Sequence, residues 1–196
     1  MKTVLVTPPN TEPLTLEEVK AHLRVEVPND DTLIVIYIAA ARQWCESFTR
    51  RAFMPQTWDV YLDGFPEDEI EIPLSPVASV TYVKYIDGNG VTQTLADGTD
   101  YTTSISTGPS AGRTTIEPYF DTSFPTPRDQ PDSVWYRYVA GYADAASVPG
   151  PIRAAILLLV GHLYANREAV VAGTIASEVP FTIKNLLYPF RLYEFK

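Results

Sequence analysis

The distribution of proline limits the folds that are open to this chain. Eleven of its 17 prolines lie between Pro55 and Pro151, in a sequence of 196 residues. Proline has no backbone N–H to donate, and its ring clashes with the preceding turn of a helix, so this stretch cannot form long helices. The residues on either side of it carry apolar side chains at helical spacing. We therefore predict a β-rich section between two helical sections.

Apolar and polar residues alternate with a period of two in the middle section, between turn residues. Asp87-Gly88-Asn89-Gly90 joins two of these runs and predicts a tight hairpin, because glycine adopts positive φ at little cost. Pro118 to Pro131 is expected to be an extended, irregular connection, since it holds four prolines. The predicted strands are Trp58–Leu62, Val77–Ile86, Val91–Leu95, Tyr101–Ile105, Arg113–Ile116 and Val134–Val139.

These patterns predict an α+β fold, in which the N- and C-terminal sections form a small helical bundle and an antiparallel β domain is inserted between them. The predicted sections are residues 1–53, the β-rich insertion 54–148, and residues 149–196, which pack with 1–53. Their net charges are −1, −10 and +2, so the insertion holds the acidity of a chain whose total is −9.

Three of the predicted helices are located by their end signals. Thr15 and Glu18 form a capping box for the first helix, and one of the residues 29–31 is expected to cap the second. The third begins at Pro149-Gly150-Pro151, where proline suits a first turn. The second and third helices are more apolar than a helix with one buried face requires, so we expect neighbouring subunits to cover them. The expected subunit-interface residues are Ile34, Ile38, Leu158 and Tyr164.

A last amphipathic segment follows Pro180. Chain ends normally fray into water, so an apolar end is a candidate docking element in which large side chains fill grooves of a partner. The expected docking residues are Leu186, Leu187, Phe190, Tyr193 and Phe195.

The composition argues against several classes of protein. A net charge of −9 disfavours a grip on a nucleic-acid backbone, which needs clustered cations. Cys45 is the single cysteine, so neither an intramolecular disulfide framework nor a multi-cysteine zinc module is expected. The apolar runs are far shorter than the roughly 20 residues of a membrane helix. The first residues lack the pattern of a secretion signal, and we expect a soluble protein made in a reducing compartment.

One catalytic motif occurs, at Gly108-Pro109-Ser110-Ala111-Gly112, which matches the G-x-S-x-G nucleophile elbow of serine hydrolases. That elbow requires a strand-to-helix turn and a histidine in reach of the serine. A strand pattern follows here, and the two histidines are His22 and His162, the second of them within an apolar helix. We favour a loop between strands and predict no catalytic residue.

Metal and cofactor sites are also disfavoured. Asp63 to Glu69, with Glu71, could gather a hard cation such as calcium, but the spacing does not match an EF-hand and favours a solvated acidic turn. Two histidines and one cysteine without ligand spacing argue against a transition-metal site. No cofactor is predicted.

Several blocks together resemble the head–tail connector (adaptor, or head-completion) proteins of tailed bacteriophages and prophages. The β-rich insertion points to a larger subgroup of that family, because its compact members are almost wholly helical. The blocks are Leu14-Thr15-Leu16-Glu17-Glu18-Val19-Lys20 with Leu23 and Arg24, Asp30-Asp31-Thr32-Leu33-Ile34 leading to Ala39-Ala40-Ala41-Arg42, Tyr138-Val139-Ala140-Gly141-Tyr142, Val148-Pro149-Gly150-Pro151-Ile152-Arg153-Ala154-Ala155-Ile156 and His162-Leu163-Tyr164-Ala165-Asn166-Arg167-Glu168.

The resemblance implies a non-enzymatic virion protein of the head–tail interface, assembled in the host cytoplasm and not bound to a membrane. Such a protein forms a ring, usually of twelve copies, under the portal protein. It prolongs the DNA channel, without specific DNA binding, and presents a surface for a tail-side stopper or terminator protein. The isolated chain can stay monomeric until the portal nucleates the ring. The C-terminal docking residues would then meet the portal, and the β insertion would form the outer or tail-facing surface.

Two alternatives stay open on the sequence alone. The first is a structural protein of a phage tail or baseplate. The second is a stand-alone β-domain binding module or serine hydrolase, in which Ser110 or the acidic loop is the working part.

Overall fold

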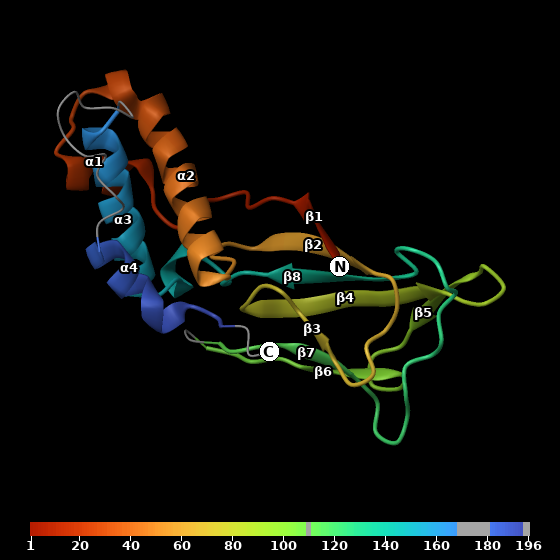
Figure 1. Ribbon diagram of the computed structural model, residues 1–196. Helices are drawn as coiled ribbons and strands as arrows, with labels where there is room; N and C mark the ends of the chain where they lie inside the picture. The colour runs from red at the N-terminus through yellow and green to blue at the C-terminus, as the bar shows by residue number, and fades with distance from the viewer. Residues whose placement is uncertain (109–110, 168–180, 194–196) are drawn as a thin grey trace. The chain divides into compact units, whose positions relative to one another are not determined.

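The computed structural model describes residues 1–108, 111–167 and 181–193. They form two compact units (Figure 1), and each is described by itself. The β unit comprises Met1–Asn10 and Met54–Ala143, and the helical unit comprises Thr11–Phe53 and Asp144–Lys196. The predicted α+β class, with helices and an inserted β region, is confirmed. The division differs from the predicted sections mainly at the N-terminus, because residues 1–10 belong to the β unit.

The helical unit is built from four α-helices and three short 3-10 helices among its described residues. The capping box of the first helix is present: the Glu18 N–H donates to Thr15 Oγ1 at 3.2 Å, and the Thr15 N–H donates to Glu18 Oε2 at 2.9 Å. The elements are α1 (Leu16–Leu23), η1 (Pro28–Asp30), α2 (Asp31–Thr49), η2 (Ala145–Ser147), α3 (Gly150–Ala165), α4 (Phe181–Leu187) and η3 (Tyr188–Phe190).

The core of the helical unit lies where α3 packs against α2 and α4 (Figure 1). Side chains from all three helices are buried there. Their burial removes apolar surface from water, which stabilises the fold by roughly 25 cal/mol for each Å². The buried isoleucine and leucine side chains there include Ile34, Ile38, Ile152, Ile156, Ile183 and Leu187.

Two of the expected subunit-interface residues are buried in this packing. Ile34 and Ile38 were expected to meet a neighbouring subunit, but they are 0% and 2% exposed, because side chains of the same chain cover them. The apolar side chains of α2 that remain exposed are Val35 and Ile36, at 49% and 58%.

The β unit holds two antiparallel sheets: a five-stranded sheet in the order β1-β2-β8-β4-β5 and a three-stranded sheet in the order β3-β7-β6. All six predicted strands are present within one or two residues of their expected bounds. Two strands, β1 and β3, were not predicted. The strands are β1 (Lys2–Thr7), β2 (Gln56–Leu62), β3 (Ile70–Glu71), β4 (Val77–Ile86), β5 (Thr92–Leu95), β6 (Tyr101–Ser104), β7 (Thr115–Pro118) and β8 (Val134–Ala140).

Strand β8 organises the core of the β unit. It pairs with β2 on one side and β4 on the other. Alternate residues from Val134 to Ala140 are buried, so one face of the strand points into the core. The Tyr136 hydroxyl donates to the Glu71 carbonyl oxygen at 3.4 Å and so links β8 of the larger sheet to β3 of the smaller one. Burial raises the pKa of Tyr136 and of Tyr138, which keeps both phenols neutral.

The predicted hairpin joins β4 and β5, with Ile86 opposite Thr92. Gly90 has a φ of 82°, as the turn demands. The Asp87 carboxylate accepts the N–H groups of Asn89 and Val91 at 2.9 and 3.0 Å, which fixes the turn.

Gly141 follows β8 and has a φ of 126°, a backbone conformation that disfavours any residue with a Cβ. A Cβ at this position would collide with the Met54 carbonyl group and would lie 2.7 Å from the Pro55 nitrogen. The Ala140-Gly141-Tyr142 block therefore has a physical cause, since only glycine allows this close approach of backbone to backbone.

Candidate interaction surfaces

The described residues do not assemble a metal centre. Among them, no group of three or more His, Cys, Asp and Glu side chains could hold a metal ion. Asp63, from the predicted acidic turn, is engaged with the backbone instead: its Oδ1 accepts the Asp132 N–H at 3.0 Å. Glu71 pairs with Arg113 at 2.9 Å. Within the same residues, no helix combines the length and hydropathy that a membrane crossing requires.

The G-x-S-x-G segment is only partly described, because Ser110 lies outside the described residues. Its second half is a loop that leads into strand β7, whereas a nucleophile elbow leads into a helix. Serines from elsewhere in the β unit hold this loop in place. The Ser75 hydroxyl donates to the carbonyl oxygens of Ala111 and Gly112 at 3.2 and 2.9 Å, and the Gly112 N–H donates to Ser106 Oγ at 2.7 Å.

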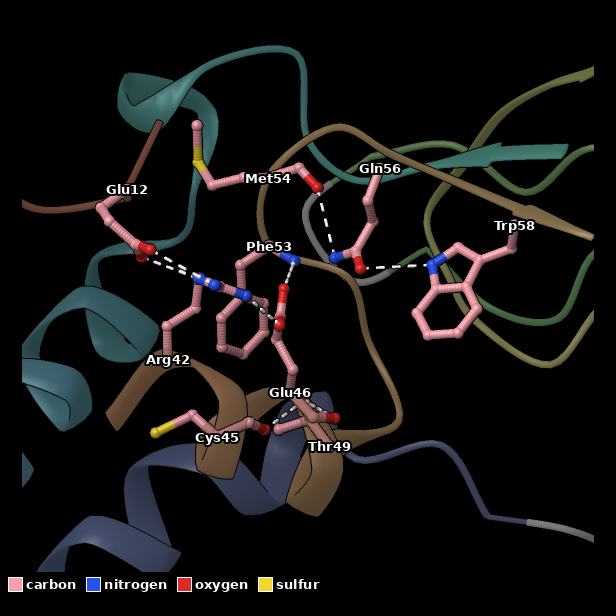
Figure 2. A network of polar contacts seen from close by, with 9 residues as sticks. All are labelled: Glu12, Arg42, Cys45, Glu46, Thr49, Phe53, Met54, Gln56 and Trp58. Carbon is pink, nitrogen blue, oxygen red and sulfur yellow. Dashed lines mark hydrogen bonds and ion pairs between the residues drawn. The ribbon is translucent and has the colours of Figure 1, made fainter. Parts of the chain in front are cut away.

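A buried polar network fixes two loops of the helical unit onto α2 (Figure 2). The Arg42 side chain, 7% exposed, donates from Nε to Glu12 Oε2 at 2.7 Å and from Nη1 to Glu46 Oε2 at 2.6 Å. Glu46 Oε1 accepts the Phe53 N–H at 2.7 Å. Burial by itself would lower the pKa of Arg42, but the hydrogen bond that it donates to Glu12 and the charge of Glu46 raise it. Glu12 and Phe53 lie beside two of the three points where the chain passes from one unit to the other, so Arg42 and Glu46 together anchor these two crossings on the helical side.

Cys45 lies in the helical core and is 0% exposed. Burial, followed by the nearby Glu46 charge, raises the pKa of its thiol to about 12. A thiol of this kind is a packing residue and does not supply a nucleophile at neutral pH.

Aromatic and cationic side chains gather at the C-terminal end of α2. Trp44 and Phe48 stack with ring centroids 5.4 Å apart, and the Tyr188 ring meets Phe48 edge-on at 5.5 Å. The Arg191 guanidinium lies 5.0 Å from the Phe48 ring centroid and 5.4 Å from that of Tyr193. We call these five residues the C-terminal aromatic cluster. Residues of these types dominate the energetics of protein interfaces.

The segment that carries this cluster is held down by backbone contacts and by two buried side chains. The Leu192 N–H donates to the Thr49 carbonyl oxygen at 3.0 Å, and Arg51 Nε donates to the Phe190 carbonyl oxygen. Leu187 and Phe190 are 0% and 8% exposed, so they serve the core of their own unit. Both are among the residues predicted to fill grooves of a partner.

Of the other expected docking residues, Tyr193 is 51% exposed and Leu186 is half-buried, and Phe195 lies outside the described residues. The spacing of Trp44 and Phe48 was visible in the sequence, whereas their contacts with Tyr188 and Arg191 were not, because these come from a distant segment.

The other two expected interface residues lie on α3. Leu158 is 38% exposed and remains available to a neighbour. Tyr164 is half-buried, and its hydroxyl donates to Asp30 Oδ2 at 2.6 Å. Arg167 Nη2 reaches the same oxygen at 2.7 Å. Both hydrogen bonds lower the pKa of Asp30, and the one from Tyr164 has the larger effect. They also join the end of α3 to the start of α2.

Comparison with known proteins gives these surfaces a context. A family model described as "phage gp6-like head-tail connector protein" matches residues 13–106. No curated protein matches the chain.

Three solved structures that share the fold come from a gene transfer agent (GTA) particle. A chain in the neck of the empty particle, computed with C6 symmetry, is 23% identical with a TM-score of 0.81, and the match covers 100% of this chain and 98% of that one. A chain in the virion of the native particle has the same identity, TM-score and coverage. A chain in the native neck computed with C12 symmetry is 21% identical with a TM-score of 0.75, at 100% and 98% coverage.

These structures establish the fold of the whole chain. The family match adds a similarity in sequence to connector proteins. By that match, residues 13–106 are similar to the phage gp6-like head–tail connector proteins.

Proposed function

We propose that this chain is the structural head–tail connector of a tailed phage, prophage or related particle. It forms a ring under the portal protein, prolongs the DNA channel and joins the head to the tail. The match of residues 13–106 to the connector family carries this proposal. The fold shared with chains from the neck of a phage-like particle supports it over the whole length.

The ring is proposed to contain twelve copies, in keeping with the C12 symmetry applied to one of the necks that contain this fold. A ring closes when each subunit presents two different, complementary patches to its neighbours. The exposed apolar side chains of the helices supply one such patch, namely Val35, Ile36 and Leu158. They replace the buried Ile34 and Ile38 as the interface residues of α2.

The portal protein is proposed to bind the C-terminal aromatic cluster. Tyr188 and Tyr193 are 42% and 51% exposed although both belong to a packed aromatic group. A side chain that is held in place before binding loses little conformational entropy when a partner covers it. The neighbouring Arg191 adds a cation that can pair with a portal carboxylate or stack on a portal ring.

The role is proposed to be structural, without catalysis. The net charge of −9 fits a channel protein, because a wall that is poor in cations does not hold passing DNA through counterion release. The tail-side partner is proposed to be a stopper or terminator protein.

The test mixes the purified chain with the portal protein of the same particle and measures affinity and ring formation, the latter by electron microscopy. We expect Tyr193→Ala to weaken portal binding at least about tenfold, as for a central interface aromatic. The matched control is Phe181→Ala, since Phe181 is 73% exposed in the same unit but outside the cluster. Unchanged binding by Tyr193→Ala, or equal losses in both variants, would contradict docking through the cluster.

A further inference from the structure

The β unit presents one large apolar side chain almost entirely to solvent. Phe120 is 89% exposed, more than any other large apolar residue among those described. It lies in the connection between β7 and β8, next to Tyr119, which is 43% exposed. Single exposed apolar residues are common on proteins, so exposure alone does not make Phe120 a contact residue. Its supports do.

The turn that carries Phe120 is fixed by hydrogen bonds. The Thr122 N–H and hydroxyl both donate to the Tyr119 carbonyl oxygen, at 3.0 and 2.6 Å. The Tyr119 N–H donates to the Asp100 carbonyl oxygen at 3.1 Å, which ties the turn to the residues before β6. Asp121 completes the turn with a φ of 60°. The backbone is therefore held on both sides of Phe120 while its ring stays uncovered.

A second phenylalanine in the same connection shows the contrast. Phe124 stacks on Phe65 with ring centroids 4.7 Å apart and an interplanar angle of 11°. Phe65 in turn meets Tyr85 of β4 edge-on at 5.8 Å. Phe124 thus anchors the connection to the β unit, whereas Phe120, four residues earlier, is left free to contact another molecule.

The surroundings of Phe120 specify the charge of a partner. Asp121 follows it directly, and the turn before Tyr101 carries Asp97 and Asp100, while Tyr101 faces Pro118 across the β6–β7 pair. None of the ion pairs among the described residues involves these three aspartates. The β unit as a whole has a net charge of −8, counted over its two segments. An exposed ring on a turn that lies among aspartates of an acidic unit complements an apolar pocket edged by lysine or arginine.

We propose that the turn from Tyr119 to Thr122 is a docking knob, with Phe120 inserted in an apolar, basic-rimmed pocket of the tail-side protein. The assignment to the tail side rests on the proposed function, in which the C-terminal aromatic cluster is committed to the portal. An aromatic side chain that is carried on a fixed backbone turn and becomes buried on binding is the usual form of an interface hot spot.

The test joins heads to tails in vitro. Heads are isolated from a tail-deficient strain that produces the wild-type or a variant chain, and are mixed with purified tails of the same particle. Two quantities are measured: the copies of the chain retained per head, and the fraction of heads that acquire tails in electron micrographs. The variants are Phe120→Ala and Asp121→Lys. The matched control is Val91→Ala, since Val91 is 54% exposed at the β4–β5 turn of the same unit.

We expect Phe120→Ala to keep the melting temperature and the copies per head of the wild type, and to lower head–tail joining at least about tenfold. Asp121→Lys is expected to lower joining by charge repulsion at the pocket rim, and Val91→Ala to have no effect. Normal joining with Phe120→Ala would overturn the knob, and normal joining with Asp121→Lys would overturn the basic rim. Loss of the folded Phe120→Ala chain from the heads would also overturn the knob, because Phe120 would then contact the head side. Absence of the wild-type chain from heads would contradict the connector function itself. The measured number of copies per head distinguishes this result from a failure of the knob alone.

Discussion

Arg42 and Glu46 lie one turn apart on α2, with Arg42 Nη1 2.6 Å from Glu46 Oε2. Each of the two also binds a residue outside the helix: Arg42 binds Glu12, and Glu46 binds the backbone of Phe53. Glu12 lies where the chain first enters the helical unit and Phe53 where it leaves that unit, so this one pair holds two of the three crossings between the units. A buried pair of this kind is costly to break from one side, because the remaining charge loses its partner.

Arg42→Met is therefore expected to lower the free energy of unfolding by about 3 kcal/mol, because it removes the buried guanidinium that both Glu12 and Glu46 bind. Chemical denaturation followed by circular dichroism measures the change. The matched control is Gln43→Met at the next, exposed position of the same helix, where a change within about 0.5 kcal/mol is expected. Equal effects of the two substitutions would show that the network does not stabilise the fold.

Gly141→Ala is expected to destabilise the β unit by at least about 2 kcal/mol, because the added Cβ meets backbone atoms that cannot move aside as a side chain can. Gly88→Ala is the control: a Cβ there meets no atom within 4 Å. Thermal unfolding of both variants tests the difference. A Gly141→Ala protein as stable as the control would mean that the backbone relaxes around the new atom.

The end of α3 is expected to lose its attachment to α2 in acid. The hydrogen bonds from Tyr164 and Arg167 lower the pKa of Asp30 in the folded chain. The stabilisation that they provide is therefore complete above the ordinary aspartate pKa of about 3.9, and it is lost as the pH falls through the lowered value. Wild type should be more stable than Asp30→Asn at about pH 7, and the difference should shrink below about pH 4. Denaturation curves over this range test it, and a difference that does not change with pH would refute the assignment.

Cys45 is expected to resist thiol reagents in the folded protein, because its thiol is buried and its pKa is raised to about 12. The comparison is a Ser47→Cys variant, which adds a thiol at an exposed position of the same helix. At neutral pH, the folded variant should react quickly with one equivalent of Ellman's reagent, at the added thiol. Cys45 should react only after denaturant has unfolded the protein. Rapid reaction of the wild type without denaturant would place Cys45 at an accessible surface.

Local signals allowed much of the fold to be predicted. The capping box at Thr15 and Glu18, the hairpin at Asp87–Gly90 and the alternation in β8 each depend on residues that are close in the sequence, and all three are present. Strand β1 was missed because it has no buried face. All six of its residues are exposed, and its partner β2 lies some fifty residues away in the sequence.

The surfaces were harder to predict, for a physical reason. Apolar residues around a helix show that it needs cover, but they do not show whether the same chain or a neighbour provides it. Ile34, Ile38, Leu187 and Phe190 turned out to be covered by their own unit. Phe120 and Phe124 are the same residue type in one connection, and only the structure shows that one is an anchor and the other exposed.

The measurement that tests the central claim most directly is a cryo-electron microscopy reconstruction of the neck of the particle that encodes this chain. The account predicts a ring of this fold between the portal and the tail, with the C-terminal aromatic cluster of each copy against the portal protein. Density for the fold in the tail tube or baseplate, or a neck from which it is absent, would contradict the account.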